Sequence, residues 1–349
     1  MPSYAPVSGT VVQTPAVLAT LNEYKNKTLI PQGYVQTAFT GLLFGDAPGS
    51  DGTEMRPKVP IPAFRKPKRT TAQGTQVEMI LNFETGSNVQ TYRGAQDLNT
   101  GIYQGGTKIF SPWAQYTTFV TIARDQSLHN AGTGKQYDLL KSQLEQNTRQ
   151  VFRRLETDLC STNTDVVENS QDELPGIQHW IATTPTSTCH GLNRTTYTPF
   201  RNQTATIASF ATGGLDGMQS FMYTTSGTNG NMPCDAIFTT QTLHGYYAKQ
   251  AMAVHRITGS LNGADLGVGG TLFFQGIPLI HTPDWAAGIQ TWINTADLHT
   301  FIETGSNWDM QSYQPPADLA VLHMQRWFFH AALLHARHET NGVITVSAA

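Results

Sequence analysis

One long amphipathic stretch, at residues 134–160, limits the possible folds more than any other feature of this sequence. Apolar side chains recur there at steps of three and four residues, which is the spacing of one face of an α-helix. They are Tyr137, Leu140, Leu144, Val151, Leu155 and Leu159. Thr133 and Gln136 have the spacing of an N-terminal capping box. A helix of this length is about 40 Å long, so the sequence predicts a strut with one face on the core.

The first 72 residues have little periodicity, and residues 56–69 (RPKVPIPAFRKPKR) are both basic and rich in proline. The prolines forbid a helix and favour an extended backbone. The cations of this segment are Arg56, Lys58, Arg65, Lys66, Lys68 and Arg69. Such a segment cannot build a core, so we expect it to lie over its own domain or over a neighbouring molecule. Contact with nucleic-acid phosphates is the second interpretation. Stacking on bases is not expected, because Phe64 is the only aromatic residue within 56–69.

Residues 76–125 are rich in β-branched and aromatic residues, in runs that glycines interrupt. This pattern predicts a long antiparallel ribbon of two strands. Its tip, at residues 98–107 (LNTGIYQGGT), is polar and rich in glycine. The candidate contact residues of this tip are Leu98, Gly101, Ile102, Tyr103, Gly105 and Gly106. An isolated ribbon is marginally stable in water, so we expect it to need a partner surface.

The second half of the chain predicts a series of shorter elements. A strand is expected at residues 236–240, a helix at 241–254, and a pair of strands at 271–280. Residues 291–303 continue the β pattern. The end of the chain predicts a hairpin, because Asn341-Gly342 separates two β-rich runs and Asn-Gly is the strongest short hairpin signal.

The composition points to a protein that lies against other copies of itself. Only 13% of the residues are charged, about half the usual share, and a surface so poor in charge favours contact with other chains. The formal net charge of −3 excludes a globally basic nucleic-acid-binding protein. No signal peptide and no run of 18 apolar residues is visible.

The cysteines and the short motifs predict no enzyme. Cys160, Cys189 and Cys234 are odd in number and widely spaced, so we interpret them as reduced thiols of a protein made in the cytoplasm. Residues 132–136 (GTGKQ) lack the first glycine and the Ser or Thr of a phosphate-binding loop. The glycines of GVGG at 267–270 precede a strand, where phosphate binding needs them after one.

The histidines and the Cys189-His190 pair are also interpreted structurally. Adjacent residues do not normally point at one another, so we expect Cys189 and His190 to lie in a polar loop rather than to form a nucleophile and its base. Four histidines crowd the last strands without the spacing of a metal site. They are His323, His330, His335 and His338. We expect them to pack at a strand interface, with a pH-sensitive subunit contact as the alternative, and we expect no catalytic residues, metal or cofactor.

In this order, the elements resemble those of the Hong Kong 97-type major capsid proteins of tailed bacteriophages. The resemblance rests on the proline-rich arm, the ribbon, the strut helix, the passage DAIFTTQTLHGYYAKQ to GIPLIHTPDW, and the last segment LHMQRWFFHAALLHARHETNGVITV. It implies an α+β capsid fold with an N-terminal arm, an extension loop, a spine helix, and peripheral and axial domains. The implied boundaries are 1–75 for the arm, 76–125 for the extension loop, 126–165 for the peripheral domain with the spine helix, 166–315 for the axial domain and 316–349 for the closing peripheral strands.

The resemblance also implies a function. Its members build the icosahedral phage head from hexamers and pentamers of one polypeptide, in the host cytoplasm and around a portal, and the head is later filled with double-stranded DNA. We expect scaffolding or decoration proteins, if used, to be separate chains. Some members cross-link a lysine of the extension loop to an asparagine. Lys108 is the only lysine of the ribbon, but the surrounding pattern does not match and the chemistry is not carried over. The alternatives are a tail-tube or decoration protein and, third, an enzyme.

Overall fold

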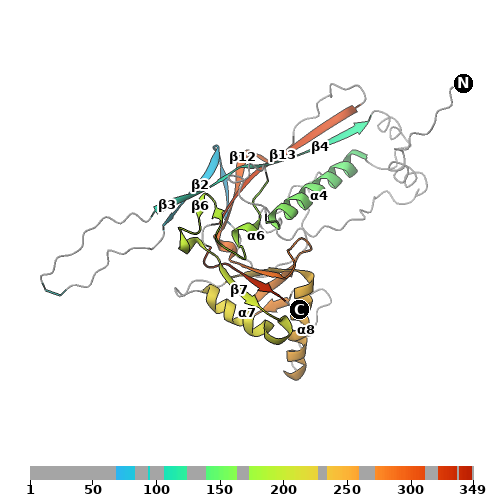
Figure 1. The fold of residues 1–349 in the computed structure, drawn as a ribbon. Coiled ribbons are helices and arrows are strands. Elements are labelled where there is room, and N and C mark those ends of the chain that lie inside the picture. Colours follow the sequence, from blue (N-terminus) through green and yellow to red (C-terminus); the bar gives the residue numbers. More distant parts are fainter. Residues whose placement is uncertain are drawn as a thin grey trace, which may run out of the picture.

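The computed structural model describes residues 68–82, 93–94, 106–123, 139–162, 173–226, 234–258, 272–310, 321–335 and 338–347. They form two main sheets, a two-stranded ribbon and several helices (Figure 1). A mixed α and β architecture, as expected, is therefore confirmed. Of the basic arm residues, only Lys68 and Arg69 lie within the described part, and of the expected ribbon tip at residues 98–107 only Gly106 and Thr107 do.

The first sheet has four strands in the order β1 (Lys68–Ala72), β12 (Leu298–Met310), β13 (Val321–His335) and β4 (Ala114–Ala123). β1 runs parallel to β12, and the other neighbours are antiparallel. The helix α4 (Leu139–Leu159) lies beside this sheet (Figure 1).

Helix α4 confirms the predicted strut over its 21 described residues. Residues 134–138, where the sequence predicts its first turn, lie outside the described residues. Leu155 and Leu159 of the apolar stripe are completely buried, so its C-terminal half rests on the core as the periodicity predicts.

The predicted ribbon is shorter than the sequence suggests. β2 (Gln76–Asn82) pairs antiparallel with β3 (Gly106–Pro112). The next strand, β4, leaves the ribbon and pairs with β13 of the four-stranded sheet. The expectation that the ribbon extends to residue 125 is therefore wrong for 114–123. Alternation along a strand shows which face is buried but does not identify the partner strand, and β13 offers β4 a long antiparallel partner.

The second sheet has six strands in the order β7, β14, β11, β8, β10 and β9. Their bounds are β7 (Gln203–Ile207), β14 (Gly342–Val346), β11 (Ile289–Ile293), β8 (Ala236–Thr239), β10 (Ile277–His281) and β9 (Leu272–Phe274). Helices α7 (Phe210–Ser226) and α8 (Gln241–Thr258) contribute to one apolar cluster with Trp292 and Ile344 of this sheet. The alternate residues Ile293 and Val343 belong to the other cluster. The sheet therefore separates two cores.

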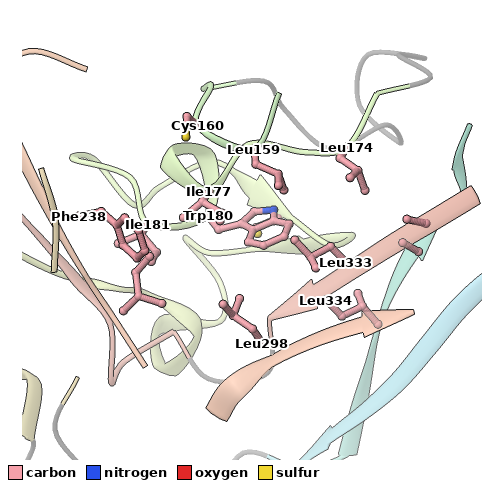
Figure 2. Packing of buried hydrophobic residues seen from close by; sticks show 14 of the residues in the cluster. Leu159, Cys160, Leu174, Ile177, Trp180, Ile181, Phe238, Leu298, Leu333 and Leu334 are labelled. Atoms are coloured by element: carbon pink, nitrogen blue, oxygen red, sulfur yellow. The ribbon is translucent and has the colours of Figure 1, made fainter. Parts of the chain in front are cut away.

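The larger core lies between the two sheets and the end of α4. It centres on Trp180 of the short helix α6 (Ile177–Trp180), which is completely buried. Figure 2 shows Leu159, Leu298 and Leu333 around it. Burying apolar surface stabilises a fold by about 25 cal/mol per Å². Because the residues of this core come from the four-stranded sheet, α4 and the six-stranded sheet, their burial fixes these three parts relative to one another.

Several short predictions are confirmed, but one helix was not predicted. The strand β8, the helix α8 and the antiparallel pair β9–β10 lie where the sequence places them. Helix α7 contains Gly213, Gly214 and Gly217, which have poor helix propensity. A Cβ on Gly217 would lie 2.7 Å from the Ile207 side chain, so close packing on β7 requires glycine there.

The predicted terminal hairpin is wrong. β13 ends in the four-stranded sheet, while β14 lies between β7 and β11 in the six-stranded sheet. Asn341-Gly342 therefore joins two sheets: the Asn341 side chain accepts a hydrogen bond of 2.6 Å from the backbone N–H of Asn294. A Cβ on Gly342 would lie 2.4 Å from the Phe221 ring, which explains the glycine. In the same way, β11 and β12 belong to different sheets, separated by the 3-10 turn Thr295–Asp297.

Candidate assembly surfaces

The ribbon has one packed face and one open face. Val77 and Met79 of β2 lie opposite Ser111 and Ile109 of β3, and these side chains are buried or half-buried. The alternate residues point the other way, and Ile80 is 81% exposed. A ribbon whose packed face is covered by its own chain offers its opposite face to other molecules.

The open face carries an ion pair beside the exposed Ile80. The ammonium of Lys108 donates to both carboxylate oxygens of Glu78, at 3.1 Å each. The Gln76 side chain also donates to Glu78, and together these two contacts lower the pKa of the Glu78 carboxyl. Ile80 lies directly across from Lys108. The face thus combines one large apolar side chain with a neutralised pair of charges.

The base of the ribbon is fixed to a small hairpin formed by β5 (Thr188–Cys189) and β6 (Leu192–Asn193). The Phe110 N–H donates to the carbonyl of His190 at 3.3 Å. Gly191 has a φ of +80°, and a Cβ there would lie 2.3 Å from the Phe110 ring. On the other side, the Trp113 indole N–H donates to the carbonyl of Gly74 at 2.7 Å. These contacts fix the direction in which the ribbon leaves the body.

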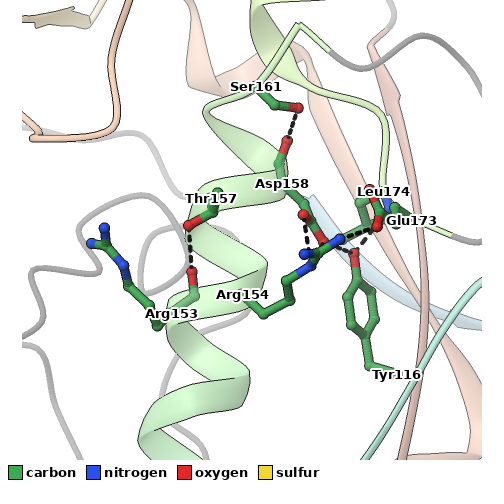
Figure 3. A network of polar contacts seen from close by, with 8 residues as sticks. All are labelled: Tyr116, Arg153, Arg154, Thr157, Asp158, Ser161, Glu173 and Leu174. Atoms are coloured by element: carbon green, nitrogen blue, oxygen red, sulfur yellow. Dashed lines mark hydrogen bonds and ion pairs between the residues drawn. The ribbon is translucent and has the colours of Figure 1, made fainter.

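Helix α4 is held on the four-stranded sheet by a polar network (Figure 3). The Tyr116 hydroxyl of β4 donates to the Asp158 carboxylate of α4 at 2.9 Å and accepts from the Leu174 N–H at 2.9 Å. Arg154 forms ion pairs with Asp158, at 3.0 Å, and with Glu173. Three segments of the chain, namely β4, α4 and residues 173–174, are joined in this way.

Burial shifts the proton affinities of this network. Desolvation raises the pKa of Asp158, against the opposing effects of the Tyr116 hydroxyl and of Arg154. Desolvation is also the main reason why the pKa of Tyr116 is raised, and the neighbouring Asp158 charge adds to it. The Asp158 charge raises the pKa of Arg154 in turn. The network therefore joins helix and sheet through groups whose proton affinities depend on burial and on one another.

A further ion pair joins the helix to the second sheet region. Arg153 of α4 donates to Asp284, which follows β10, at 2.8 Å. Arg153 and Arg154 thus contact different halves of the molecule from neighbouring positions on one helix.

Other large apolar side chains are exposed on the described surface. Phe119 of β4 is 59% exposed and Tyr223 of α7 is 62% exposed. No sequence pattern had indicated that these residues or Ile80 would be exposed. Alternation in the ribbon gave a signal for Ile80, but the packed face was known only once β2 and β3 were paired.

The placement of Cys189 and His190 differs from the one expected from the sequence. Cys189 and His190 are buried in the β5–β6 hairpin, so the interpretation as a polar loop is wrong. Their ligand atoms and those of His338 all lie within 4.8 Å of one another. His330 instead forms an ion pair with Glu303 across β12 and β13, and His338 lies beyond the end of β13. Sequence spacing did not reveal the cluster, because the fold brings His338 to a distant part of the chain.

The fold is similar to those of known proteins, although the sequence is not. No family model and no curated protein matches the sequence. The structure, however, is similar to the capsid of cyanophage A-1(L), with a TM-score of 0.61 and 14% identity over 93% of this chain and 97% of that chain. The chain has a phage capsid fold.

Two further solved structures agree with this placement. The mature capsid of bacteriophage PhiM1 gives a TM-score of 0.56 at 11% identity, over 93% of this chain and 91% of that chain. The capsid of a native GTA particle gives 0.54 at 8% identity, over 98% and 99%. The capsid fold expected from the order of elements in the sequence is therefore confirmed. Within the described residues, no helix is long and apolar enough to cross a membrane.

Proposed function

We propose that this protein is a major capsid protein, which assembles with copies of itself into an icosahedral phage head around double-stranded DNA. The observation that carries the proposal is the similarity to the cyanophage capsid over nearly the full length of both chains. A shell subunit acts by binding its neighbours, so this role needs no catalytic residues, metal or cofactor.

The surfaces support this role physically. The exposed Ile80 on the open ribbon face and the exposed Phe119 on β4 are apolar surface that contact with another subunit would bury. Each such contact is modest, but many of them repeated by symmetry suffice for a closed shell. The low content of charged residues, 13%, reduces both the desolvation cost and the repulsion of packing identical copies together.

We assign the elements of the fold to parts of the subunit on this basis. The β2–β3 ribbon is the base of an extension loop whose tip, at residues 98–107, reaches a neighbouring subunit, and α4 is the spine helix. The four-stranded sheet with α4 forms the peripheral domain. The six-stranded sheet with α7 and α8 forms the axial domain, to which β14 also belongs. The basic residues 56–69 form part of an arm that clamps a neighbouring subunit, with contact to packaged DNA as the second interpretation.

The proposed partners follow from this assignment. The subunit forms hexamers and pentamers in the host cytoplasm and joins a portal, and scaffolding or decoration proteins are separate chains if they take part. The mature location is the virion.

The test is to express the full chain alone and to examine the purified protein by negative-stain electron microscopy. We expect closed shells or isolated hexamers and pentamers. A tail-tube protein would form rings or open tubes, and a decoration protein would form small symmetric oligomers that bind only to preformed shells. A stable monomer that forms no assembly at high concentration would refute the proposal.

A further inference from the structure

A cluster of three ligand-type side chains lies inside the protein at the base of the ribbon. Cys189 ends β5, His190 occupies the following turn, and His338 lies between β13 and β14. The relative exposures of the three are 0%, 1% and 0%. Their ligand atoms lie within 4.8 Å of one another. Among the described residues, none of the three side chains reaches the surface, so a substrate cannot contact the thiol. The cluster is therefore not a catalytic nucleophile with its base.

Aromatic rings enclose the cluster. The Trp180 ring centroid lies 5.0 Å from that of His190, and the Phe200 centroid lies 4.1 Å from that of His338. Two imidazoles with one thiolate are a typical ligand set for Zn²⁺ and Cu⁺.

The backbone around His190 points the same way. His190 and Gly191 both have positive φ, 51° and 80°, in the two-residue turn between β5 and β6. Asn, Asp or Gly is the usual residue at the first position of such a turn. Histidine also adopts positive φ more often than most residues, and the turn places His190 directly after Cys189.

We propose that Cys189, His190 and His338 form a buried structural site for a d10 metal ion of the Zn²⁺ or Cu⁺ class. The inference goes beyond the proposed capsid function and does not depend on it. Bond lengths of about 2.0–2.3 Å place the ligand atoms of such an ion roughly 3.3–3.8 Å apart. The ligand atoms of the cluster lie within 4.8 Å of one another, which exceeds the spacing around a bound ion by up to about 1 Å.

Charge distinguishes the two ions. One thiolate and two neutral imidazoles leave a Cu⁺ site neutral and a Zn²⁺ site with one positive charge. Arg194, whose guanidinium donates to the carbonyls of Trp180 and His179, adds positive charge nearby. A three-coordinate Cu⁺ site is therefore the electrostatically favoured form, while Zn²⁺ would need a fourth ligand such as water.

The position of the site gives it a structural consequence. The β5–β6 hairpin supports the ribbon, because the backbone N–H of Phe110 donates to the backbone carbonyl of His190. The backbone carbonyl of His338 accepts from the N–H of Asn341, in the segment that leads to β14. A bound ion would join the base of the ribbon to the connection between the two sheets. It binds as the chain folds, because the closed site has no entry path, so its binding energy adds to the stability of the fold.

The first test measures metal in the full-length protein, made in medium supplemented with zinc or with copper and purified without chelators. Elemental mass spectrometry should find about one ion per chain, and which medium loads the site identifies the metal. Cys189→Ala and His338→Gln should reduce the number of metal ions per chain at least about tenfold. The matched controls Cys234→Ala and His281→Gln should retain the metal content of the unaltered protein. Less than about 0.1 ion per chain in the unaltered protein from both media would overturn the inference, whether or not any variant folds.

The second test locates the ion. Protein refolded with Co²⁺ should show a thiolate-to-cobalt charge-transfer band that Cys189→Ala abolishes and Cys234→Ala keeps. Hydrogen exchange should become faster at residues 188–193 and 338–342 when the metal is omitted. Metal bound with no such band, or with unchanged exchange in both segments, would also overturn the assignment. Shells that assemble without any metal would refute this inference alone and leave the capsid function intact.

Discussion

The hydroxyl of Tyr116 on β4 and the carboxylate of Asp158 on α4 are joined by a hydrogen bond of 2.9 Å, in a place where Asp158 is almost fully buried. This contact joins the helix to the outer strand of the four-stranded sheet. Because the same hydroxyl accepts from the Leu174 N–H, one side chain satisfies two buried groups.

Tyr116→Phe should therefore destabilise the protein by about 1–3 kcal/mol, because it leaves a buried carboxylate and a backbone N–H without this partner. Urea unfolding followed by tryptophan fluorescence measures the change. The control is Tyr223→Phe on α7, because Tyr223 is 62% exposed and its hydroxyl accepts a hydrogen bond of 3.2 Å from the Gln219 side chain. It should change stability by less than about 0.5 kcal/mol. Equal effects of the two variants would contradict the network's role.

Gly191→Ala should loosen the base of the ribbon. The new methyl would lie 2.3 Å from the Phe110 ring on a backbone with φ of +80°, so it adds a clash to a conformational cost. We expect a loss of about 2–5 kcal/mol in unfolding free energy. Gly276→Ala is the matched control, because Gly276 has φ of +86° and nothing within 4 Å of its added Cβ. Its loss should be about 1–2 kcal/mol, and a loss as large as that of Gly191→Ala would show that no clash occurs.

Stability should fall as the pH falls below about 6.5, in part because of His244. Desolvation, and next the neighbouring His281, lower the pKa of His244 from its ordinary value of 6.5. The two rings lie 4.8 Å apart between centroids. In this range the unfolded chain binds a proton that the folded His244 does not, so stability is present above 6.5 and is lost as the pH decreases toward the lowered pKa. The loss is at most about 1.4 kcal/mol per pH unit, and less because the side chain is half-exposed.

The measurement is urea unfolding at about pH 7.5 and about pH 5.5. His244→Gln should reduce the difference between the two values, and His281→Gln should reduce it partly. His330→Gln is a control on the other sheet, where His330 faces Glu303. A pH dependence that is unchanged in His244→Gln would refute this assignment.

Ile80→Ser should impair assembly without unfolding the subunit. Ile80 is 81% exposed on the open ribbon face, so its replacement should change stability by less than about 0.5 kcal/mol. The yield of shells, measured by gradient sedimentation and microscopy, should fall. Met79→Ser on the packed face should instead destabilise the fold by about 1–3 kcal/mol. Full shell yield from Ile80→Ser would show that this face contacts no neighbour.

Deletion of residues 98–107 tests the proposed role of the ribbon tip. Circular dichroism and size-exclusion chromatography should show a folded, soluble subunit, because the deletion removes only Gly106 and Thr107 from the outer end of β3 and leaves residues 76–80 of β2 paired with 108–112. Electron microscopy should show no shells, since the contact with the neighbouring subunit is removed. Normal particles from the deletion variant would refute the role given to the tip.

The local elements of this fold were predictable from the sequence where a period was long or a pattern was repeated. The apolar stripe along α4 predicts a helix whichever surface it meets, and the alternation in β2 and β3 predicts strands. The same holds for β8, α8 and the β9–β10 pair. Helix α7 was not predicted, because Gly213, Gly214 and Gly217 lower its helix propensity. Packing against Ile207 explains Gly217, and contact with the Phe210 ring explains Gly214.

Which segments pair with one another could not be predicted from the sequence and is set by the tertiary structure. β4 and β3 adjoin in the chain but lie in different sheets, and Asn341-Gly342 joins two sheets although it has the sequence of a hairpin turn. Strand pairing and burial depend on contacts between residues far apart in the chain, which a local pattern does not contain. The cluster of Cys189, His190 and His338 follows the same rule: the chain supplies the ligand types, and the fold alone brings the third ligand to the other two.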